Sequence, residues 1–417
     1  MYRSLSRISQ HIGGTRSVAK QQARRLTLLE HHSHKLLKQY GIPVPHGFVV
    51  ASPDDAKSVV SEINAPSMLK SQILAGGRGK GKVDSDGKGG VRMAKTPEEA
   101  FEDASNMLNH YLTTKQTPLG GLLVKKLYIY KAVDVAHEYY FSVTIDRERY
   151  SPVLLISDEG GVNIESNVDK LHKFWFSLSS GVTPELIAQI QARLLFSTSE
   201  LPVIEHIIRQ MVALFREKDA ILLELNPLAL TREGDFVCLD AKFDFDDAAR
   251  FRQRDIFSLE EHASNQEDEH EASKHGLVYI RLDGNIGNIV NGAGLAMATN
   301  DLINLHGGRS ANFLDIGGKA TTETLQKAFE ILNRDSRVQG IWVNIFGGIV
   351  RCDMTATSII EAASAMGGFR VPVVVRLQGT NSVEAMKLIE ASELDLSTES
   401  DFELAAERII ELTPRCV

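Results

Sequence analysis

Hydrophobic and polar positions in the first 240 residues follow both helical and strand-like spacing. Apolar residues recur at helical intervals from 28 to 37, and Gly41 follows as a typical residue just past a helix end. Thr96, Pro97 and Glu99 form a helix-start signature, which predicts a helix over 96–111. Further helices are predicted at 183–196 and 201–217, and strands at 67–74, 121–130, 138–145 and 152–156, with a strand–turn–strand series over 220–240.

The pattern changes after a charged connector at 260–275, which has no apolar periodicity and is expected to be helical only in its second half. Apolar strands are then predicted at 277–282, 311–316, 340–346 and 371–377, alternating with helices that begin near 292 and span 321–333, 353–366 and 382–391. This strand–helix alternation predicts an α/β domain with a doubly wound parallel sheet.

The first 29 residues carry six basic side chains and no acidic one. This Arg- and Ser-rich composition, without a continuous apolar stretch, is typical of an organellar transit peptide. A disordered basic tail is the alternative, and a basic helix on an anionic membrane fits less well because large apolar residues are few. We therefore exclude residues 1–25 from the fold and predict import into the mitochondrial matrix or a related organelle.

The amino-acid composition limits the classes of protein to which the chain can belong. The 417-residue chain is 43% hydrophobic and 24% charged, as expected of a globular protein, and its net charge of −8 argues against general nucleic-acid binding. No apolar run reaches the length of a membrane span. Three cysteines without a Cys-x-x-Cys pair exclude a disulfide framework and a cysteine-built zinc site. The 13 histidines include no His-x-x-His pair on a convincing helix face, so we interpret them as solvated or packing residues.

A glycine-rich basic loop at 75–82 follows the predicted strand 67–74. Four glycines alternate with three bases, which lets backbone N–H groups and cationic side chains close over phosphates. The spacing is not that of a Walker A loop, and a flexible basic hairpin is the alternative. Lys70, on the preceding strand, favours an anionic ligand.

Carboxylate and amide side chains gather around a second pair of strands. The strand period of two places Glu224 and Asn226 on one face, and Asp240 ends a later strand that could lie beside them. Such oxygens suit a Mg²⁺ ion that bridges nucleotide phosphates. A polar strand end followed by an Asn-Pro turn is the alternative.

Two glycine turns in the C-terminal half each join a predicted strand to a helix, at 291–294 and 344–353. Such turns direct helix N–H groups at an anion, and two of them could share one crevice. A dinucleotide-binding fingerprint is a weak rival, because Met297 occupies the position of its third glycine although Asp315 is suitably placed. Ordinary strand–helix turns are the other alternative.

Together these segments resemble the β subunits of succinyl-CoA synthetase (succinate–CoA ligase) from about residue 26 to the C-terminus. The resemblance is carried by AGGRGK (75–80), LLELNPL (222–228), VCLDAKFDFDDAA (237–249), LDGNIGNIVNGAGLAMATND (282–301), HGGRSANFLDIGGKAT (306–321), VNIFGGIVRCD (343–353) and VPVVVRLQGTN (371–381).

The resemblance implies an ATP-grasp domain at 26–262 and a flavodoxin-like CoA-ligase domain at 263–417. It also implies an α-subunit partner that binds CoA and carries a phosphorylated histidine, with no nucleic acid or membrane involved. By motif, phosphate contacts fall on Lys70, Gly77, Arg78 and Gly79; base and ribose contacts on Tyr130, Val133 and Glu138; one Mg²⁺ ion on Asn226 and Asp240; the approaching phosphohistidine on Glu224; and succinate on Asn291, Gly348, Ile349 and Val350.

The chain departs from the family pattern at one position. Members often have Glu where Tyr130 aligns, whereas Pro45 resembles the ATP-preferring members, so we expect ATP rather than GTP. The alternatives are a malate–CoA ligase β subunit, a scaffold subunit that has lost nucleotide binding, and an NAD-dependent dehydrogenase.

Overall fold

The computed structural model describes residues 25–118, 120–161, 170–261, 267–318, 321–348, 351–392 and 394–414. The chain divides into two compact units, Met1–Ala263 and Ser264–Val417. All of the expected transit peptide except Arg25 lies outside the described residues. No helix in the described ranges is long and apolar enough to cross a membrane.

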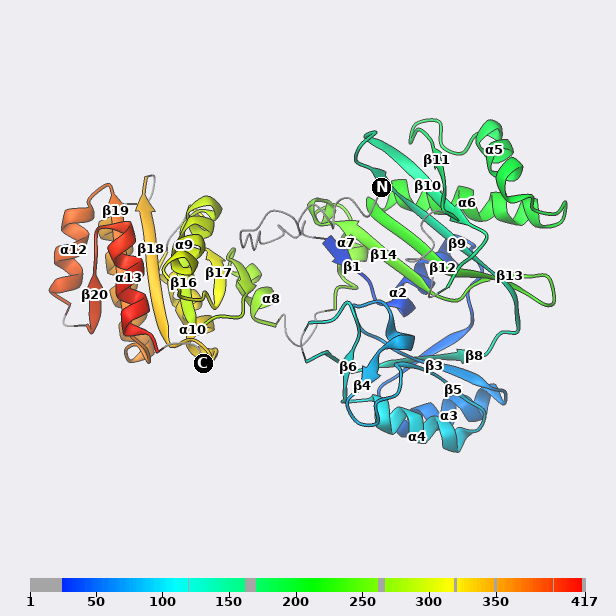
Figure 1. Ribbon diagram of the computed structural model, residues 1–417, viewed down its shortest axis with the longest axis horizontal. Helices are drawn as coiled ribbons and strands as arrows, with labels where there is room; N and C mark the ends of the chain where they lie inside the picture. Colours follow the sequence, from blue (N-terminus) through cyan, green and yellow to red (C-terminus); the bar gives the residue numbers. More distant parts are fainter. Residues whose placement is uncertain are drawn as a thin grey trace. The chain divides into compact units, whose positions relative to one another are not determined.

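The larger sheet of the first unit has seven strands, all of whose pairings are antiparallel (Figure 1). Their order is β1 (Arg25–Thr27), β14 (Ala241–Asp246), β12 (Ala220–Thr231), β9 (Val135–Asp146), β10 (Ser151–Ser157) and β11 (His172–Trp175), with β13 (Phe236–Cys238) paired to β12. Its core includes apolar side chains of α2 (Glu30–Gln39), α5 (Pro184–Leu194) and α6 (Glu200–Glu217).

The second sheet of this unit has one apolar and one polar face. Its order is β2 (Gly47–Val50), β8 (Leu127–Lys131), β3 (Ser67–Ser71) and β5 (Val91–Ala94). Leu69 and Ile129 pair across β3 and β8 and pack into a core with α3 (Pro53–Ile63) and α4 (Pro97–Met107). Because side chains alternate along a strand, Lys70 and its partner Tyr128 face the opposite way. This alternation explains why a charged side chain can stand on a buried strand.

Short elements complete the first unit. They are the 3₁₀ turn η2 (Arg78–Lys80), the sheet of β4 (Lys82–Val83), β6 (Tyr111–Thr113) and β7 (Leu122–Leu123), the 3₁₀ turn η5 (Asp247–Ala249), and α7 (Arg254–Phe257). The predicted cap of α4 is confirmed, since the Thr96 hydroxyl accepts a hydrogen bond from Glu99 N at 3.2 Å. The helix ends at Met107 rather than at 111, because residues from Tyr111 onward join β6.

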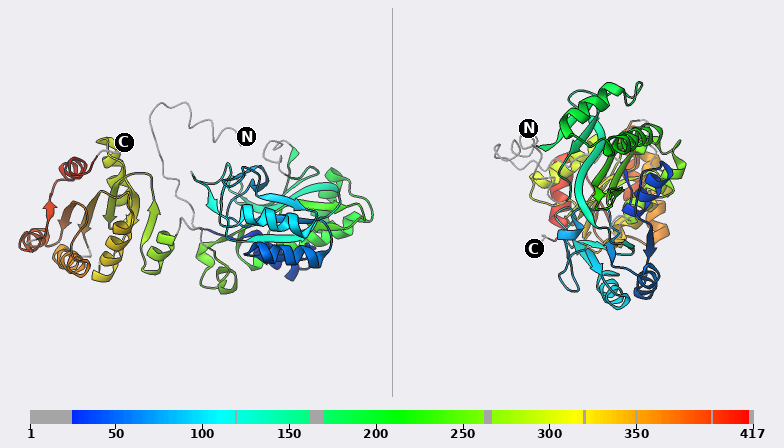
Figure 2. Two further views of the ribbon diagram at one scale, coloured as in Figure 1. Left: turned by 90° about the horizontal axis from the view of Figure 1, so that it is seen from below. Right: turned by 90° about the vertical axis from the view of Figure 1, so that its right-hand side faces the viewer.

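The second unit has helices on both faces of a six-stranded sheet (Figure 2). The strand order is β15 (Val278–Arg281), β17 (Asn312–Asp315), β16 (Ile286–Val290), β18 (Gly340–Gly347), β19 (Val373–Gly379) and β20 (Leu396–Thr398). One face packs against α10 (Thr322–Arg334), α11 (Cys352–Met366) and α12 (Ser382–Glu390), the other against α9 (Ala293–Leu305) and α13 (Phe402–Leu412), and α8 (Glu267–Lys274) precedes β15. Successive side chains of a strand point to opposite faces. Along β18, Ile341 accordingly packs in the core on the side of α10, α11 and α12, and Trp342 in the core on the side of α9 and α13.

The sheet is parallel except at one edge. The predicted strand at 277–282 forms β15, which runs antiparallel to β17. The strand that leads into α9 is instead β16, over Ile286–Val290, which pairs in parallel with both β17 and β18. Sequence reading missed β16 because its Gly and Asn residues resemble a turn, although all five of its residues are buried.

Candidate functional site

Residues far apart in the sequence meet on the polar face of the four-stranded sheet. Lys70 Nζ on β3 lies 3.5 Å from Asp240 Oδ2, and Arg78 Nη2 donates to both Asp240 oxygens at 2.9 and 3.0 Å. Asp240 stands in the short segment between β13 and β14. The glycine-rich loop and the second strand pair, which sequence analysis treated separately, therefore form one site.

Sequence analysis missed the residue at the centre of this group. Glu30, in the first turn of α2, is 4% exposed and pairs with Lys70 Nζ at 2.7 Å and with Arg78 Nη1 at 2.8 Å. Two cations and the two carboxylates of Glu30 and Asp240 thus balance in charge. No local motif marks Glu30, since its role depends on contacts 40 and 48 residues away along the chain.

The pKa values of the group reflect this balance. Burial alone would raise the pKa of Glu30, but Lys70 and Arg78 outweigh it and hold that pKa far below its ordinary value. Burial would likewise lower the pKa of Lys70, yet Asp240 and Glu30 keep it above its usual range. Glu30, Lys70 and Arg78 therefore all remain charged in the folded protein.

The candidate metal ligands lie at adjoining backbone positions, Asn226 on β12 and Asp240 just before β14. Asn226 N donates to Asp240 O at 2.9 Å, as the register of β12 and β14 requires, and the Asn226 side-chain oxygen accepts from Gly161 N at 2.6 Å. The Asp240 side chain is 34% exposed, so its oxygens can be reached from solvent. An amide oxygen and a carboxylate are both hard oxygen donors of the kind that Mg²⁺ prefers.

Glu224 lies two residues before Asn226 on the same strand, and the two side chains interact. Burial raises the pKa of the Glu224 carboxyl, which is opposed chiefly by Lys242 on the paired strand β14. A carboxyl with this environment can hold or exchange a proton more readily than an exposed one.

The predicted base-contacting residues are not gathered in one place. Tyr130 is buried beside the charged group: its hydroxyl donates to Leu239 O at 3.2 Å, and Lys70 Nζ lies 5.6 Å from its ring centroid. Val133 is half-buried between β8 and β9, and Glu138 is exposed on β9. A turn connects Glu138 to the metal ligands, since Gly160 N donates to Glu138 O at 2.8 Å and the next residue contacts Asn226.

Gly77 and Gly79 shape the basic loop differently. Gly77 has a φ of +72°, a conformation that favours glycine, and the space where its Cβ would project is open. The turn around Gly79 packs against a second glycine pair, because Gly90 N donates to Arg78 O at 2.9 Å and a Cβ on Gly89 would lie 2.5 Å from Gly79 O. The loop is thus held at one point and open at another.

The candidate acid site of the second unit is built from backbone. Asn291 follows β16, and its side chain both donates to Phe346 O at 2.8 Å and accepts from Phe346 N at 2.7 Å. Because β16 and β18 are parallel neighbours, this contact joins the two predicted glycine turns at the carboxyl ends of the strands. Gly348 is exposed immediately after β18, whereas Ile349 and Val350 lie outside the described residues.

Asp315 is engaged in shaping the first turn. Its Oδ1 accepts from Gly292 N at 2.6 Å and from Gly317 N at 2.7 Å. A carboxylate that holds the turn between β16 and α9 is not directed at a ribose. Asp315 therefore does not serve as the acidic residue that a dinucleotide-binding site requires.

Comparisons with known proteins cover nearly the whole chain. Residues 27–230 match the ATP-grasp domain family, and residues 289–410 match the CoA-ligase family. The chain is 42% identical to the mitochondrial ADP-forming succinate–CoA ligase β subunit of Neurospora crassa, over 95% of this chain and 90% of that one. It is 42% identical to the hydrogenosomal ADP-forming β subunit of Neocallimastix frontalis, over 94% and 91%, and 41% identical to the mitochondrial GDP-forming β subunit of Dictyostelium discoideum, over 93% of each.

A solved structure of ATP citrate lyase from Methanothrix soehngenii shares the fold, with a TM-score of 0.69 over 93% of this chain and all of that one, at 17% identity. The predicted fold class, an ATP-grasp domain followed by a CoA-ligase domain, is confirmed. Over 40% identity across nearly the full length, together with both domain matches, settles the family: the chain belongs to the β subunits of succinate–CoA ligase.

Proposed function

We propose that this chain is the β subunit of a succinate–CoA ligase, which reversibly converts succinate, CoA and ATP to succinyl-CoA, ADP and phosphate. The observation that carries the proposal is the meeting of Lys70 and Arg78 with Asp240, beside Asn226. Buried cations that face exposed oxygen donors form the environment that a nucleotide with its metal ion requires.

The nucleotide phosphates contact Lys70, Arg78 and the backbone N–H groups of Gly77 and Gly79. Asn226 and Asp240 would hold a single Mg²⁺ ion, which would neutralise part of the phosphate charge. Arg78 and Lys70 pair with Asp240 in this structure, and bound phosphates would offer both cations a partner in exchange for Asp240. Glu30 keeps both cations in position throughout the exchange.

The reaction moves one phosphoryl group through a histidine of the α subunit. The histidine takes it from ATP and releases ADP, succinate then accepts it as succinyl phosphate, and the CoA sulfur attacks the acyl carbon while phosphate leaves. Glu224 faces the histidine when it visits the nucleotide, and its raised pKa suits a carboxyl that shares a proton with an imidazole.

Succinate binds at the edge formed by Asn291, Gly348, Ile349 and Val350. The N-terminal ends of α9 and α11 carry backbone N–H groups that can bind an anion. Asp315 already accepts from Gly292 N at the first turn, and Arg351 and Asp353 pair at the start of α11. Such a site tolerates a succinate that becomes an acyl phosphate, because the ligand brings its own negative charge at each step.

Turnover requires an α subunit, which supplies the CoA site and the histidine. We place the pair in the mitochondrial matrix or a related organelle, on the basic, acid-free N-terminal segment and on the mitochondrial and hydrogenosomal relatives. The nucleotide is ATP by the Pro45 pattern, although ADP- and GDP-forming relatives from Dictyostelium discoideum are 40% and 41% identical to this chain.

The testing experiment is co-expression with a candidate α subunit, followed by assays with ATP and GTP and with succinate and malate. We expect ATP-dependent succinyl-CoA formation, and none from the isolated chain. Malate outcompeting succinate would assign the chain to a malate–CoA ligase. A melting temperature that Mg-ATP leaves unchanged would favour a scaffold subunit, and a shift with NAD would favour a dehydrogenase.

A further inference from the structure

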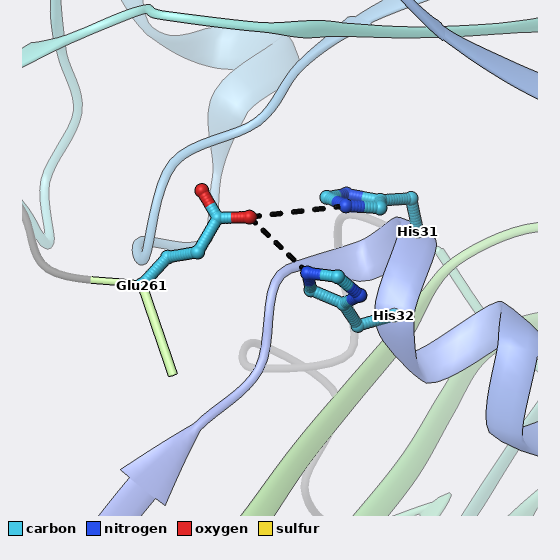
Figure 3. A group of neighbouring side chains, drawn as sticks. All are labelled: His31, His32 and Glu261. Atoms are coloured by element: carbon cyan, nitrogen blue, oxygen red, sulfur yellow. Dashed lines mark hydrogen bonds and ion pairs between the residues drawn. The ribbon is translucent and has the colours of Figure 1, made fainter. Parts of the chain in front are cut away.

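A cluster of two histidines and a carboxylate lies beside the nucleotide site but contributes nothing to it directly. His31 and His32 stand in the first turn of α2, and Glu261 follows some 230 residues later, near the end of the first unit (Figure 3). The two rings lie with centroids 3.9 Å apart and planes tilted by 39°, and both direct Nε2 at the same Glu261 oxygen.

The distances match those of ligands that share one ion. Glu261 Oε1 lies 3.1 Å from His32 Nε2 and 4.0 Å from His31 Nε2, and one ligand atom from each of the three residues lies within 4.8 Å of the others. Ligands about 2.0–2.1 Å from a common Zn²⁺ stand about 3.3 Å apart at the tetrahedral angle. The two distances from Glu261 Oε1 to the imidazole nitrogens lie on either side of this value. Side-chain rotations therefore suffice to bring the ligand atoms onto one ion.

The surroundings of His31 fix the nitrogen that a metal would use. His31 Nδ1 lies 2.9 Å from Gln72 Oε1, which can only accept, so Nδ1 carries the proton and Nε2 keeps its lone pair. A metal-binding histidine commonly donates its other ring N–H to such an oxygen. Burial also lowers the pKa of both imidazoles, which favours the neutral form that binds metals.

The site is open to solvent without being fully exposed. The side chains of His31, His32 and Glu261 are 11%, 18% and 31% exposed. An ion can therefore enter, and three protein ligands leave a fourth position for water.

Lys126 supplies the competing explanation of the cluster. Its Nζ lies 2.8 and 2.9 Å from the two Glu261 oxygens, so the carboxylate already has a cationic partner. One carboxylate can nevertheless serve an ammonium with one oxygen and a metal with the other, since each oxygen has two acceptor positions.

We infer that His31, His32 and Glu261 form a binding site for a divalent transition-metal ion of the Zn²⁺ class, separate from the Mg²⁺ ligands Asn226 and Asp240. Two imidazoles select Zn²⁺, Co²⁺ or Ni²⁺ over Mg²⁺, which prefers oxygen ligands and retained waters. Sequence analysis missed the site because the histidines are adjacent rather than spaced by a helical turn, and because the third ligand is distant.

A second group with suitable side chains is less fitted to a metal. His306 directs Nε2 at Glu403 and Nδ1 at Glu407, each at 3.4 Å. The two glutamates pair with opposite nitrogens of one imidazole, so an ion on either nitrogen would require the other glutamate to move, and both glutamates are exposed (67% and 48%). His306 therefore serves as the rival site in the test.

The test is calorimetric titration of the full-length, untagged, metal-free chain with ZnCl₂ in the absence of nucleotide. We expect one equivalent to bind, and His31→Gln and His32→Gln each to weaken binding by at least about tenfold. Gln72→Met, which removes the acceptor behind His31, is expected to weaken it about 10–100-fold. Co²⁺ bound at the same site should give visible bands typical of a four-coordinate ion.

Two matched variants separate the explanations. His110→Gln removes a histidine that pairs with a carboxylate, Asp84, at 3.0 Å but has no second imidazole, and should leave the titration unchanged. Lys126→Met removes the competing cation and should tighten binding by about tenfold. Wild-type affinity in both His31→Gln and His32→Gln, loss of binding in His306→Gln alone, or no binding by the wild-type chain would overturn the inference.

Discussion

The two candidate sites of this chain handle negative charge by different physical means. In the first unit, Glu30 and Asp240 hold Lys70 and Arg78 in an ion network in which Glu30 and both cations are buried and Asp240 is partly exposed. In the second, a neutral side chain, Asn291, bonds to the Phe346 backbone and ties together two strand–helix turns. Charged side chains suit a highly charged nucleotide with a metal ion, whereas backbone dipoles suit a small acid whose charge changes during the reaction. The first site should therefore be sensitive to loss of a charge, and the second to loss of a hydrogen bond.

The largest effect is expected from Glu30→Ala, which leaves two buried cations with one partly exposed carboxylate. Breaking a buried pair costs about 3–5 kcal/mol, because an uncompensated charge remains. The free energy of unfolding from urea titration measures this loss. The matched control is Glu98→Ala, a first-turn glutamate of α4 whose pair with Lys57 is exposed and should be worth about 0–1 kcal/mol. Equal effects of the two variants would contradict the buried network.

Asp240→Asn keeps the shape of the side chain but removes the charge that the metal ion requires. We expect turnover with the α subunit to fall about 10²–10³-fold, the range for loss of one electrostatic stabiliser. Asp235→Asn, at an exposed position five residues earlier, is the control. An active Asp240→Asn enzyme with unchanged Mg²⁺ dependence would remove Asp240 from the site.

His34 gives the first site a pH dependence. Burial disfavours the charged form of His34 and lowers its pKa to about 4, below the ordinary value of 6.5, although Glu30 opposes this shift. As the pH falls, His34 takes up a proton in the unfolded chain before it does so in the folded one. The contribution of His34 to the free energy of unfolding is therefore fully present above pH 6.5 and is lost as the pH falls towards 4. This histidine accounts for at most about 3 kcal/mol of that fall.

His34→Gln should flatten the decline between pH 6.5 and 4, although the lowered pKa values of His31 and His32 leave part of it in place. Unfolding free energies measured across this window decide the point. Exposed His137 supplies the control, and an identical slope in His34→Gln and wild type would show that His34 is not the titrating group.

Asn291→Ala tests the second site. It removes both hydrogen bonds to the Phe346 backbone and loosens the edge between the two turns. Two neutral hydrogen bonds are worth about 1–3 kcal/mol together, so the KM for succinate should rise about tenfold while the KM for ATP stays constant. Asn304→Ala, at an exposed position of α9, should change neither constant.

Tyr130→Phe should have the smallest effect. Burial raises the pKa of Tyr130 to about 12, so its hydroxyl stays protonated and donates to Leu239 O. Losing this one hydrogen bond costs about 0.5–1.5 kcal/mol of stability. Unfolding free energies measure the loss, with Tyr150→Phe, at a side chain that is 91% exposed, as the control. A loss well above this range would show that the hydroxyl does more than donate one hydrogen bond.

Local patterns predicted most of the elements, since caps, periodicity and buried strands leave marks within a few residues. The cap of α4 at Thr96 and the strand–helix alternation after the connector are examples. The strand at 277–282 was predicted and forms β15, but its antiparallel direction was not, because strand direction depends on pairing rather than on local sequence. Strand β16 was missed because a fully buried strand can use Gly and Asn when neighbouring helices supply the packing.

The site residues likewise divide into those that the local sequence reveals and those that only the fold brings together. The basic loop and the Glu224–Asn226 face could be identified from the sequence because each is contiguous. Glu30 could not be, because a glutamate in the first turn of a helix is usually explained by the helix dipole. Only the fold brings it within 2.8 Å of two cations, Lys70 on β3 and Arg78 on η2.

The division of labour between the units can be tested most directly by following labelled phosphate from ATP in the enzyme reconstituted with its α subunit. We predict that Asn291→Ala still phosphorylates the α-subunit histidine from ATP but passes little phosphate on to succinate, whereas Asp240→Asn fails at the first transfer. Normal histidine phosphorylation by Asp240→Asn, or its loss in Asn291→Ala, would contradict the assignment of nucleotide to the first unit and acid to the second.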